Sequence, residues 1–277
     1  MSTVDSRIGS AGSGVPRELR DALAAVAVTD RLLVALDFDG TLAPINDEPG
    51  KAKALPESRA AVERLASLRD TRVALVSGRS LESLEDVSEA PDDMLLVGSH
   101  GVELRLDSPD DAFTLDEEEQ ARLGLLGDVL DQVADNLDEV WLEKKPAGFA
   151  LHTRMATDHN SRIAHLVALS EARAEVDDVT VRKGKDVLEF SVRDATKGDA
   201  VEHLRRYTSS TAVFYAGDDV TDEDAFEALG ADDLGVKIGS GATAADHRVG
   251  GPADVASVLT LLADLRETHL GETPQSN

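Results

Sequence analysis

The stretch LLVALDFDGTLAPI, residues 32–45, decides how the rest of the chain is interpreted. It begins with five aliphatic residues and then places two carboxylates, Asp37 and Asp39, on either side of Phe38. Side chains two residues apart in an extended segment point the same way, so both acids can face one crevice. Gly40 permits a tight turn directly after them. The stretch therefore predicts a buried strand that ends in a pair of carboxylates.

Similar aliphatic runs recur along the chain and indicate the fold class. None alternates polar with apolar residues, so we expect both faces of each strand to be covered, as in a parallel sheet. Helix-like stretches separate the runs, and this alternation is typical of a doubly wound, Rossmann-like α/β domain. The later runs expected to form strands are 71–77, 93–99, 211–217 and 232–239.

The middle of the chain follows a different pattern. We expect two long helices there, and two hairpins at 141–155 and 179–192. Such an α+β block inside an α/β sequence predicts a cap domain inserted over one end of the sheet. The predicted division is a flexible tail at 1–15, a catalytic core at 16–101 and 186–270, a cap at 102–185 and a second tail at 271–277.

Composition excludes several classes of function. The 277 residues carry a formal net charge of −26, which argues against nucleic acid and anionic membranes as partners, because both attract lysine and arginine. The absence of cysteine excludes disulfides and thiolate metal sites. No apolar run reaches the ~20 residues of a membrane span, and the N-terminus lacks a secretory pattern. We expect a soluble cytoplasmic protein, with a monomer as the working hypothesis because the sequence does not give the oligomeric state.

Chemically active side chains are expected at one edge of the predicted sheet, because ligands bind at the carboxyl ends of parallel strands. Carboxylates gathered there repel one another unless a cation joins them, and magnesium prefers oxygen ligands beside a phosphate. A hydroxyl and an ammonium would then hold phosphate oxygens. The residues in question are Asp37, Asp39, Ser77, Gly78 and Arg79, then Lys197 and Gly198 at a helix start, and Asp218, Asp219 and Asp222 after the run 211–217.

These segments resemble a known family. DFDGTLAPI, VSGRS, Lys197-Gly198 and GDDVTDEDAF resemble the four motifs of the haloacid dehalogenase-like phosphatases. GSHGVE (98–103), EKKPAGFALHTR (143–154) and GKDVLEF (184–190) are similar to the trehalose-6-phosphate phosphatase subfamily. The resemblance covers nearly everything from residue 32 to the last helix.

The resemblance implies a reaction in two steps, the magnesium-dependent hydrolysis of trehalose 6-phosphate in trehalose biosynthesis. Asp37 would be the nucleophile that forms an aspartyl-phosphate. Asp39 would be the general acid on the sugar oxygen and then the general base on water. Ser77 and Lys197 would stabilise charge on the phosphoryl group. The implied magnesium ligands are Asp37, the Asp39 carbonyl and Asp218, with Asp219 or Asp222 in support.

The resemblance also implies sugar-contacting residues, most of them in the cap. Hinges near 98–101 and 190–196 would let the cap close over the substrate. His152 and Trp141 are expected to be structural, the latter in the cap core. The implied substrate-binding residues are Arg79, His100, Glu143, Lys145, Arg154, Lys185 and Glu189.

Several alternatives stay open. Another sugar phosphatase, acting on sucrose phosphate or a glycosyl-phosphoglycerate, would share the core motifs and differ in the cap. A receiver domain of a signalling protein also uses a strand-end aspartate, a hydroxyl, a lysine and magnesium, but it lacks a large insertion. A non-catalytic partner of a sugar-phosphate synthase typically loses core acids, and all of them are present here.

Overall fold

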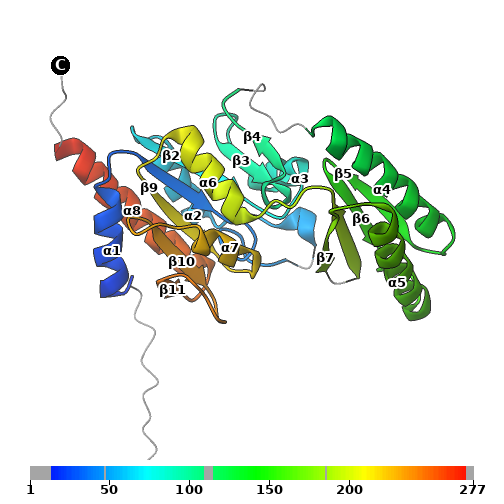
Figure 1. The fold of residues 1–277 in the computed structure, drawn as a ribbon. Helices are drawn as coiled ribbons and strands as arrows, with labels where there is room; N and C mark the ends of the chain where they lie inside the picture. The colour runs from blue at the N-terminus through cyan, green and yellow to red at the C-terminus, as the bar shows by residue number, and fades with distance from the viewer. Residues whose placement is uncertain (1–13, 47, 109–114, 185, 273–277) are drawn as a thin grey trace, which may run out of the picture.

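The part of the chain that the structure describes contains two β-sheets, each with its own helices (Figure 1). The computed structural model describes residues 14–46, 48–108, 115–184 and 186–272. Within these ranges, no helix combines the length and the apolar character that crossing a membrane would require.

The larger sheet has the strand order β11-β10-β9-β1-β2-β3-β4 and is parallel except for its last strand. Its order doubles back at β1, which lies between β2 and β9. The predicted doubly wound α/β core is confirmed, and each predicted aliphatic run forms a strand. The strands are β1 (Leu32–Leu36), β2 (Thr71–Val76), β3 (Leu95–Gly98), β4 (Glu103–Arg105), β9 (Ala212–Gly217), β10 (Leu234–Ile238) and β11 (His247–Val249).

Helices cover both faces of this sheet, which explains why its strands are apolar throughout. Leu32, Val34 and Leu36 of β1 join one core cluster, whereas Leu33 and Ala35 point to the opposite face and join another. On the first face lie α1 (Arg17–Ala27), α2 (Pro56–Ala66), α3 (Leu81–Ser88) and α8 (Pro252–Glu272), and on the second α6 (Lys197–Thr208) and α7 (Thr221–Glu227). Two short 3₁₀ helices, η1 (Pro49–Lys51) and η2 (Ser99–Gly101), lie in the connections.

The smaller sheet is antiparallel, and among the described residues its helices lie on one face. Its order is β5-β6-β8-β7, and both predicted hairpins are present. Leu151 and Leu188 pack against the helices. Glu143, Ala150, Glu189 and Arg182 lie side by side across the four strands, so they share the other face. The elements are α4 (Glu117–Asp135), β5 (Trp141–Lys145), β6 (Gly148–His152), α5 (Asp158–Glu175), β7 (Thr180–Gly184) and β8 (Val187–Ser191).

The predicted divisions at 101/102 and 185/186 do not follow the two sheets. β4 lies after the first division but pairs with β3 in the larger sheet. β8 lies after the second division but pairs with β6 and β7 in the smaller sheet. The sequence of a strand does not specify which neighbour it pairs with, so the predicted divisions put β4 in the cap and β8 in the core.

Candidate active site

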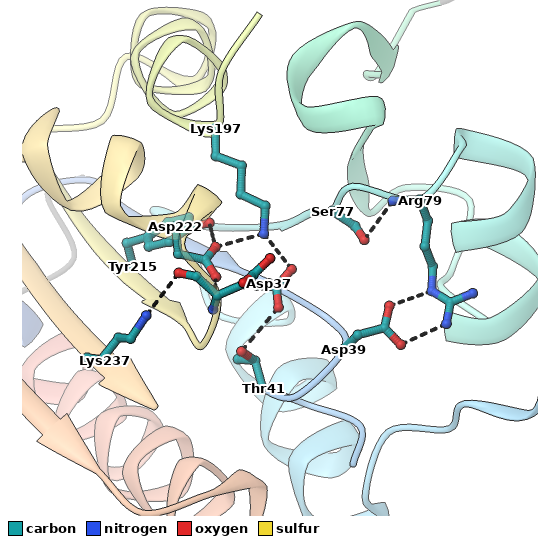
Figure 2. Close-up of polar contacts among 10 residues, drawn as sticks. Asp37, Asp39, Thr41, Ser77, Arg79, Lys197, Tyr215, Asp222 and Lys237 are labelled. Carbon is teal, nitrogen blue, oxygen red and sulfur yellow. Dashed lines mark hydrogen bonds and ion pairs between the residues drawn. The ribbon is translucent and has the colours of Figure 1, made fainter. Parts of the chain in front are cut away.

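Segments far apart in the sequence meet at the carboxyl edge of the larger sheet (Figure 2). Asp37 follows β1 directly, and its backbone N–H donates to the carbonyl of Ala216 in β9. Lys197 begins α6, and its ammonium lies 2.7 Å from Asp37 Oδ1 and 2.7 Å from Asp222 Oδ1. All three side chains are buried. The predicted nucleophile Asp37 therefore lies in one buried cluster with Lys197 and Asp222.

Asp222 is the centre of a hydrogen-bond network. Besides Lys197, its carboxylate accepts from the hydroxyl of Tyr215 at 2.7 Å and from the backbone N–H of Asp219 at 2.9 Å. The Asp219 side chain is exposed, while its carbonyl accepts from the ammonium of buried Lys237 at 2.9 Å. Asp222 thus fixes Lys197 and the backbone of Asp219. Asp219 in turn binds Lys237 through its backbone carbonyl. Sequence reasoning missed Lys237, whose signal is a lysine inside an aliphatic run.

The electrostatics of this cluster follow from burial. Removal from water raises the pKa of Asp37 to about 8, although the charge of Lys197 acts in the opposite direction. Burial and then the charge of Asp222 raise the pKa of Asp218 to about 6. Burial alone would lower the pKa of Lys197, but the charges of Asp37 and Asp222 raise it above its ordinary value. The ammonium stays charged, and the cluster carries more acid than one lysine can balance.

The acids at this edge fit a divalent cation. Asp37, Asp218 and Asp222 each offer a carboxylate oxygen, and these oxygens lie within 4.8 Å of one another. Gly40, at φ +77°, lets the Asp218 carboxylate lie against the backbone, since a Cβ there would come within 2.1 Å of Asp218 Oδ2. Hard oxygen donors with unbalanced charge suit Mg²⁺, and the haloacid dehalogenase-type phosphatases generally use it.

Asp39 lies apart from this cluster, and the prediction that the two strand-end side chains point the same way is wrong. Figure 2 shows its carboxylate pointing away from Asp37 and toward Arg79. The side-chain alternation of a strand ends with β1 at Leu36, and the following residues form a tight loop in which Leu42 N–H and Ala43 N–H both donate to the carbonyl of Phe38. Asp39 is partly exposed and paired with the guanidinium.

Hydroxyl groups surround the reactive edge. Ser77 is buried at the end of β2, and its Oγ accepts from the backbone N–H of Arg79 at 3.2 Å. Thr41, which sequence reasoning did not assign to the site, donates to Asp37 Oδ2 at 3.2 Å and is fully buried. Its signal is its position within the turn after the nucleophile. Lys197 and Thr41 thus approach the two oxygens of Asp37 from different sides.

A pocket between the two sheets collects some of the predicted substrate-binding residues. His100, Lys145 and Glu189 line it together with Gly78. A Cβ on Gly78 would lie 2.5 Å from the His100 ring, so the glycine lets the imidazole pack on the Ser77–Arg79 loop. Burial lowers the pKa of His100 to about 4, helped by the charge of Lys197, and its Nδ1 has no hydrogen-bond partner among the described residues.

Arg182 also lines this pocket, and sequence reasoning missed it. It lies opposite Glu189 on the neighbouring strand, and its guanidinium donates to the carbonyl of Ala195 at 2.8 Å. Glu189 in turn accepts from the Lys145 ammonium at 3.2 Å. Only the strand register, which the sequence does not specify, shows that Arg182 shares the polar face with these two residues.

Other predicted substrate-binding residues are not brought to this pocket. Glu143 Oε2 lies 2.7 Å from His152 Nε2, and the Arg154 guanidinium lies 5.3 Å from the Trp141 ring centroid. Trp141 stacks on His152 and does not join the cap core, so its predicted core position is wrong. Lys185 lies outside the described residues. Arg79 contacts core residues only, among the partners that its hydrogen bonds identify.

The parallel sheet, the strand-end acids with their lysine, and the second sheet over that edge define a phosphatase of the haloacid dehalogenase-like class. The sequence model of the trehalose-phosphatase family matches residues 35–250, and the chain belongs to that family.

Known relatives and structures agree with this assignment. The trehalose-phosphate phosphatase of Mycobacterium ulcerans is 33% identical over 93% of this chain and 69% of its own length. A bifunctional trehalose-6-phosphate synthase/phosphatase of Thermoproteus tenax is 34% identical over 87% of this chain and 32% of its own. The fold is similar to that of the trehalose-6-phosphate phosphatase of Aspergillus fumigatus, with a TM-score of 0.67 at 24% identity, covering 88% of this chain and 97% of the other.

Proposed function

We propose that this chain hydrolyses trehalose 6-phosphate to trehalose and phosphate, in trehalose biosynthesis, with an aspartyl-phosphate intermediate on Asp37. The observation that carries the proposal is the buried contact of Lys197 with both Asp37 and Asp222, in a member of the trehalose-phosphatase family. An ammonium beside a strand-end carboxylate can hold the oxygens of a phosphoryl group next to the attacking atom.

The reaction proceeds in two displacements at phosphorus. In the first, an Asp37 oxygen bonds to phosphorus while the bond from phosphorus to the sugar oxygen breaks, and that oxygen takes a proton from Asp39. In the second, water gives a proton to Asp39 and attacks phosphorus, which frees Asp37 and inorganic phosphate. Lys197 and Ser77 balance the charge of the phosphoryl oxygens in both steps.

Magnesium belongs to this proposal through the acids that would hold it. Asp37, Asp218 and the Asp39 carbonyl are the proposed ligands, with Asp222 or the Asp219 segment in support. The bound ion supplies positive charge against the phosphate oxygens and offsets the repulsion among the carboxylates. The raised pKa values of Asp37 and Asp218 agree with this assignment, since burial first and neighbouring carboxylates second disfavour their charged forms, which a bound cation would favour.

The smaller sheet and its two helices form the proposed cap, joined to the core near residues 99–102 and 191–196. Its polar face carries Lys145, Arg182 and Glu189 to the pocket, where they would bind sugar hydroxyls. His100 adds a neutral imidazole with an unpartnered nitrogen. Glu143, Arg154 and Lys185 stay proposed as sugar-contacting residues on the family resemblance alone. We also propose a cytoplasmic monomer with a small sugar phosphate as its partner, since a net charge of −26 disfavours nucleic acid and anionic membranes.

A phosphate-release screen tests the function. Trehalose 6-phosphate, sucrose 6-phosphate, a glucosyl-phosphoglycerate, glucose 6-phosphate and acetyl phosphate are each supplied with Mg²⁺ or with EDTA. We expect preference for trehalose 6-phosphate and loss of release in EDTA. Preference for another sugar phosphate would move the substrate assignment, and stable labelling by acetyl phosphate without turnover would indicate a receiver-type phospho-acceptor.

A further inference from the structure

We infer that Arg79 is a positioning residue for Asp39, which it holds by a two-pronged ion pair, and that it does not bind the substrate phosphate. This inference rests on the proposed function. It replaces the substrate-binding role that the sequence resemblance implied for Arg79.

The geometry of the pair is that of a fork. Arg79 Nε lies 2.5 Å from Asp39 Oδ2, and Nη2 lies 2.7 Å from Oδ1 (Figure 2). Two parallel N–H···O bonds fix both the direction and the plane of a carboxylate, which a single point charge such as lysine does not do. The orientation of the Asp39 side chain is therefore set by Arg79.

Arg79 is itself held by the core. Nη1 donates to Ser83 Oγ at 3.1 Å, and Nη2 donates also to the carbonyl of Pro49 at 2.9 Å. With the two bonds to Asp39, these contacts use four of the five N–H groups that a guanidinium carries. The Arg79 side chain is 12% exposed, whereas that of Asp39 is 36% exposed. Arg79 is the fixed partner, and Asp39 is the accessible one.

This arrangement has a consequence for the two displacements. Each oxygen of Asp39 accepts one bond from Arg79 and keeps a second lone pair, because a carboxylate has about four acceptor sites. The carboxyl group can therefore give a proton to a sugar oxygen and later take one from water while the fork fixes its orientation. Ser83 and Pro49 keep the guanidinium in place through both displacements.

The test compares two leaving groups. Departure of a sugar alkoxide needs a proton from Asp39, whereas p-nitrophenolate departs without one, and kcat/KM reports steps up to that bond cleavage. We expect Arg79→Met to lower kcat/KM for trehalose 6-phosphate by ~10²-fold, the lower range for a general acid. For p-nitrophenyl phosphate we expect a fall of under about 3-fold, because the acid contributes little there. Inhibition by inorganic phosphate should not change.

Two further variants complete the experiment. Arg79→Lys should give an intermediate loss for trehalose 6-phosphate, and it carries the test if the Met variant does not fold. Arg72→Met is the matched control, because Arg72 makes a similar two-pronged pair with Asp107, at 3.0 and 2.7 Å, near the opposite end of β2. It should leave both substrates and phosphate inhibition unchanged.

An equal fall for both substrates, together with weaker phosphate inhibition, would overturn the inference and place Arg79 on the phosphoryl group. Unchanged kinetics for both substrates would also overturn it. Failure of the proposed function looks different, since the unaltered chain would then release no phosphate from trehalose 6-phosphate.

Discussion

The two sheets of this protein place charged residues in opposite surroundings. At the carboxyl edge of the larger sheet, Lys197 is 3% exposed and Asp222 is fully buried. On the polar face of the smaller sheet, Lys145 and Glu189 form a similar pair with side chains 19% and 33% exposed. The larger sheet has helices on both faces and the smaller on one, which accounts for the difference. The charged side chains proposed to act on phosphorus are buried and fixed. The charged side chains proposed to bind the sugar are partly exposed and can change conformation.

The energetic consequences of this contrast are large. Breaking a buried ion pair leaves an uncompensated charge and costs about 3–5 kcal/mol, whereas an exposed pair contributes about 0–1 kcal/mol. Substitutions at the core edge should therefore affect both catalysis and folding. Substitutions on the cap face should change substrate affinity and leave stability nearly intact.

The largest effect is expected at the nucleophile. Asp37→Asn should reduce phosphate release by roughly 10⁴–10⁶-fold, because a covalent step is lost. The fold should be retained, because buried Lys197 keeps its ion pair with Asp222. Steady-state phosphate release and thermal unfolding by circular dichroism check the two parts. Near-normal turnover by a folded variant would remove Asp37 from its assigned role.

The two lysines give the most direct contrast between the sheets. Lys197→Met should lower the free energy of unfolding by about 3–5 kcal/mol, because Asp37 and Asp222 lose their shared partner. Lys145→Met should lower it by less than Lys197→Met does, because the Lys145–Glu189 pair is only partly buried. Urea unfolding at pH 8 measures both. Equal losses would mean that burial does not separate the two regions in energy.

A smaller effect is expected from Glu189→Gln on the cap face. Loss of a charged hydrogen-bond partner, worth about 1.5–3 kcal/mol, should raise KM for trehalose 6-phosphate roughly 10-fold or more with kcat nearly unchanged. p-Nitrophenyl phosphate has no sugar and should be unaffected. A fall in kcat for both substrates would place Glu189 in the chemistry instead of in recognition.

The smallest effect concerns pH and metal. The folded-state pKa values of Asp37 and Asp218, about 8 and about 6, lie above the ordinary 3.8. Their protonation therefore stabilises the metal-free fold at low pH, and this contribution is lost as pH rises from about 4 through 6 and then 8. Mg²⁺ needs the deprotonated acids, so it should raise the melting temperature by a few degrees at pH 8.5 and by less at pH 5.5. A larger rise at the lower pH would contradict this sign.

The core could be read from the sequence because its signals are local. Continuous aliphatic runs identify buried parallel strands, and the residues after each run lie at one edge by topology alone, which located Asp37, Ser77 and Asp218. Lys197 follows no such run and was expected from its place at a helix start. Pairings across the fold could not be read in this way. Loop closure decides that Asp39 contacts Arg79 and that Thr41 contacts Asp37. Strand register decides that Arg182 lies opposite Glu189.

The most direct measurement looks for the phosphoryl group on Asp37. The protein, with Mg²⁺, is mixed with trehalose 6-phosphate and quenched in acid within milliseconds, and borohydride then reduces any acyl phosphate before peptide mass spectrometry. We expect homoserine at position 37 in a substrate-dependent amount, with none in Asp37→Asn and none when substrate is left out. Phosphate release in the same samples with an unmodified residue 37 at every time point, or with reduction at another carboxylate, would contradict it.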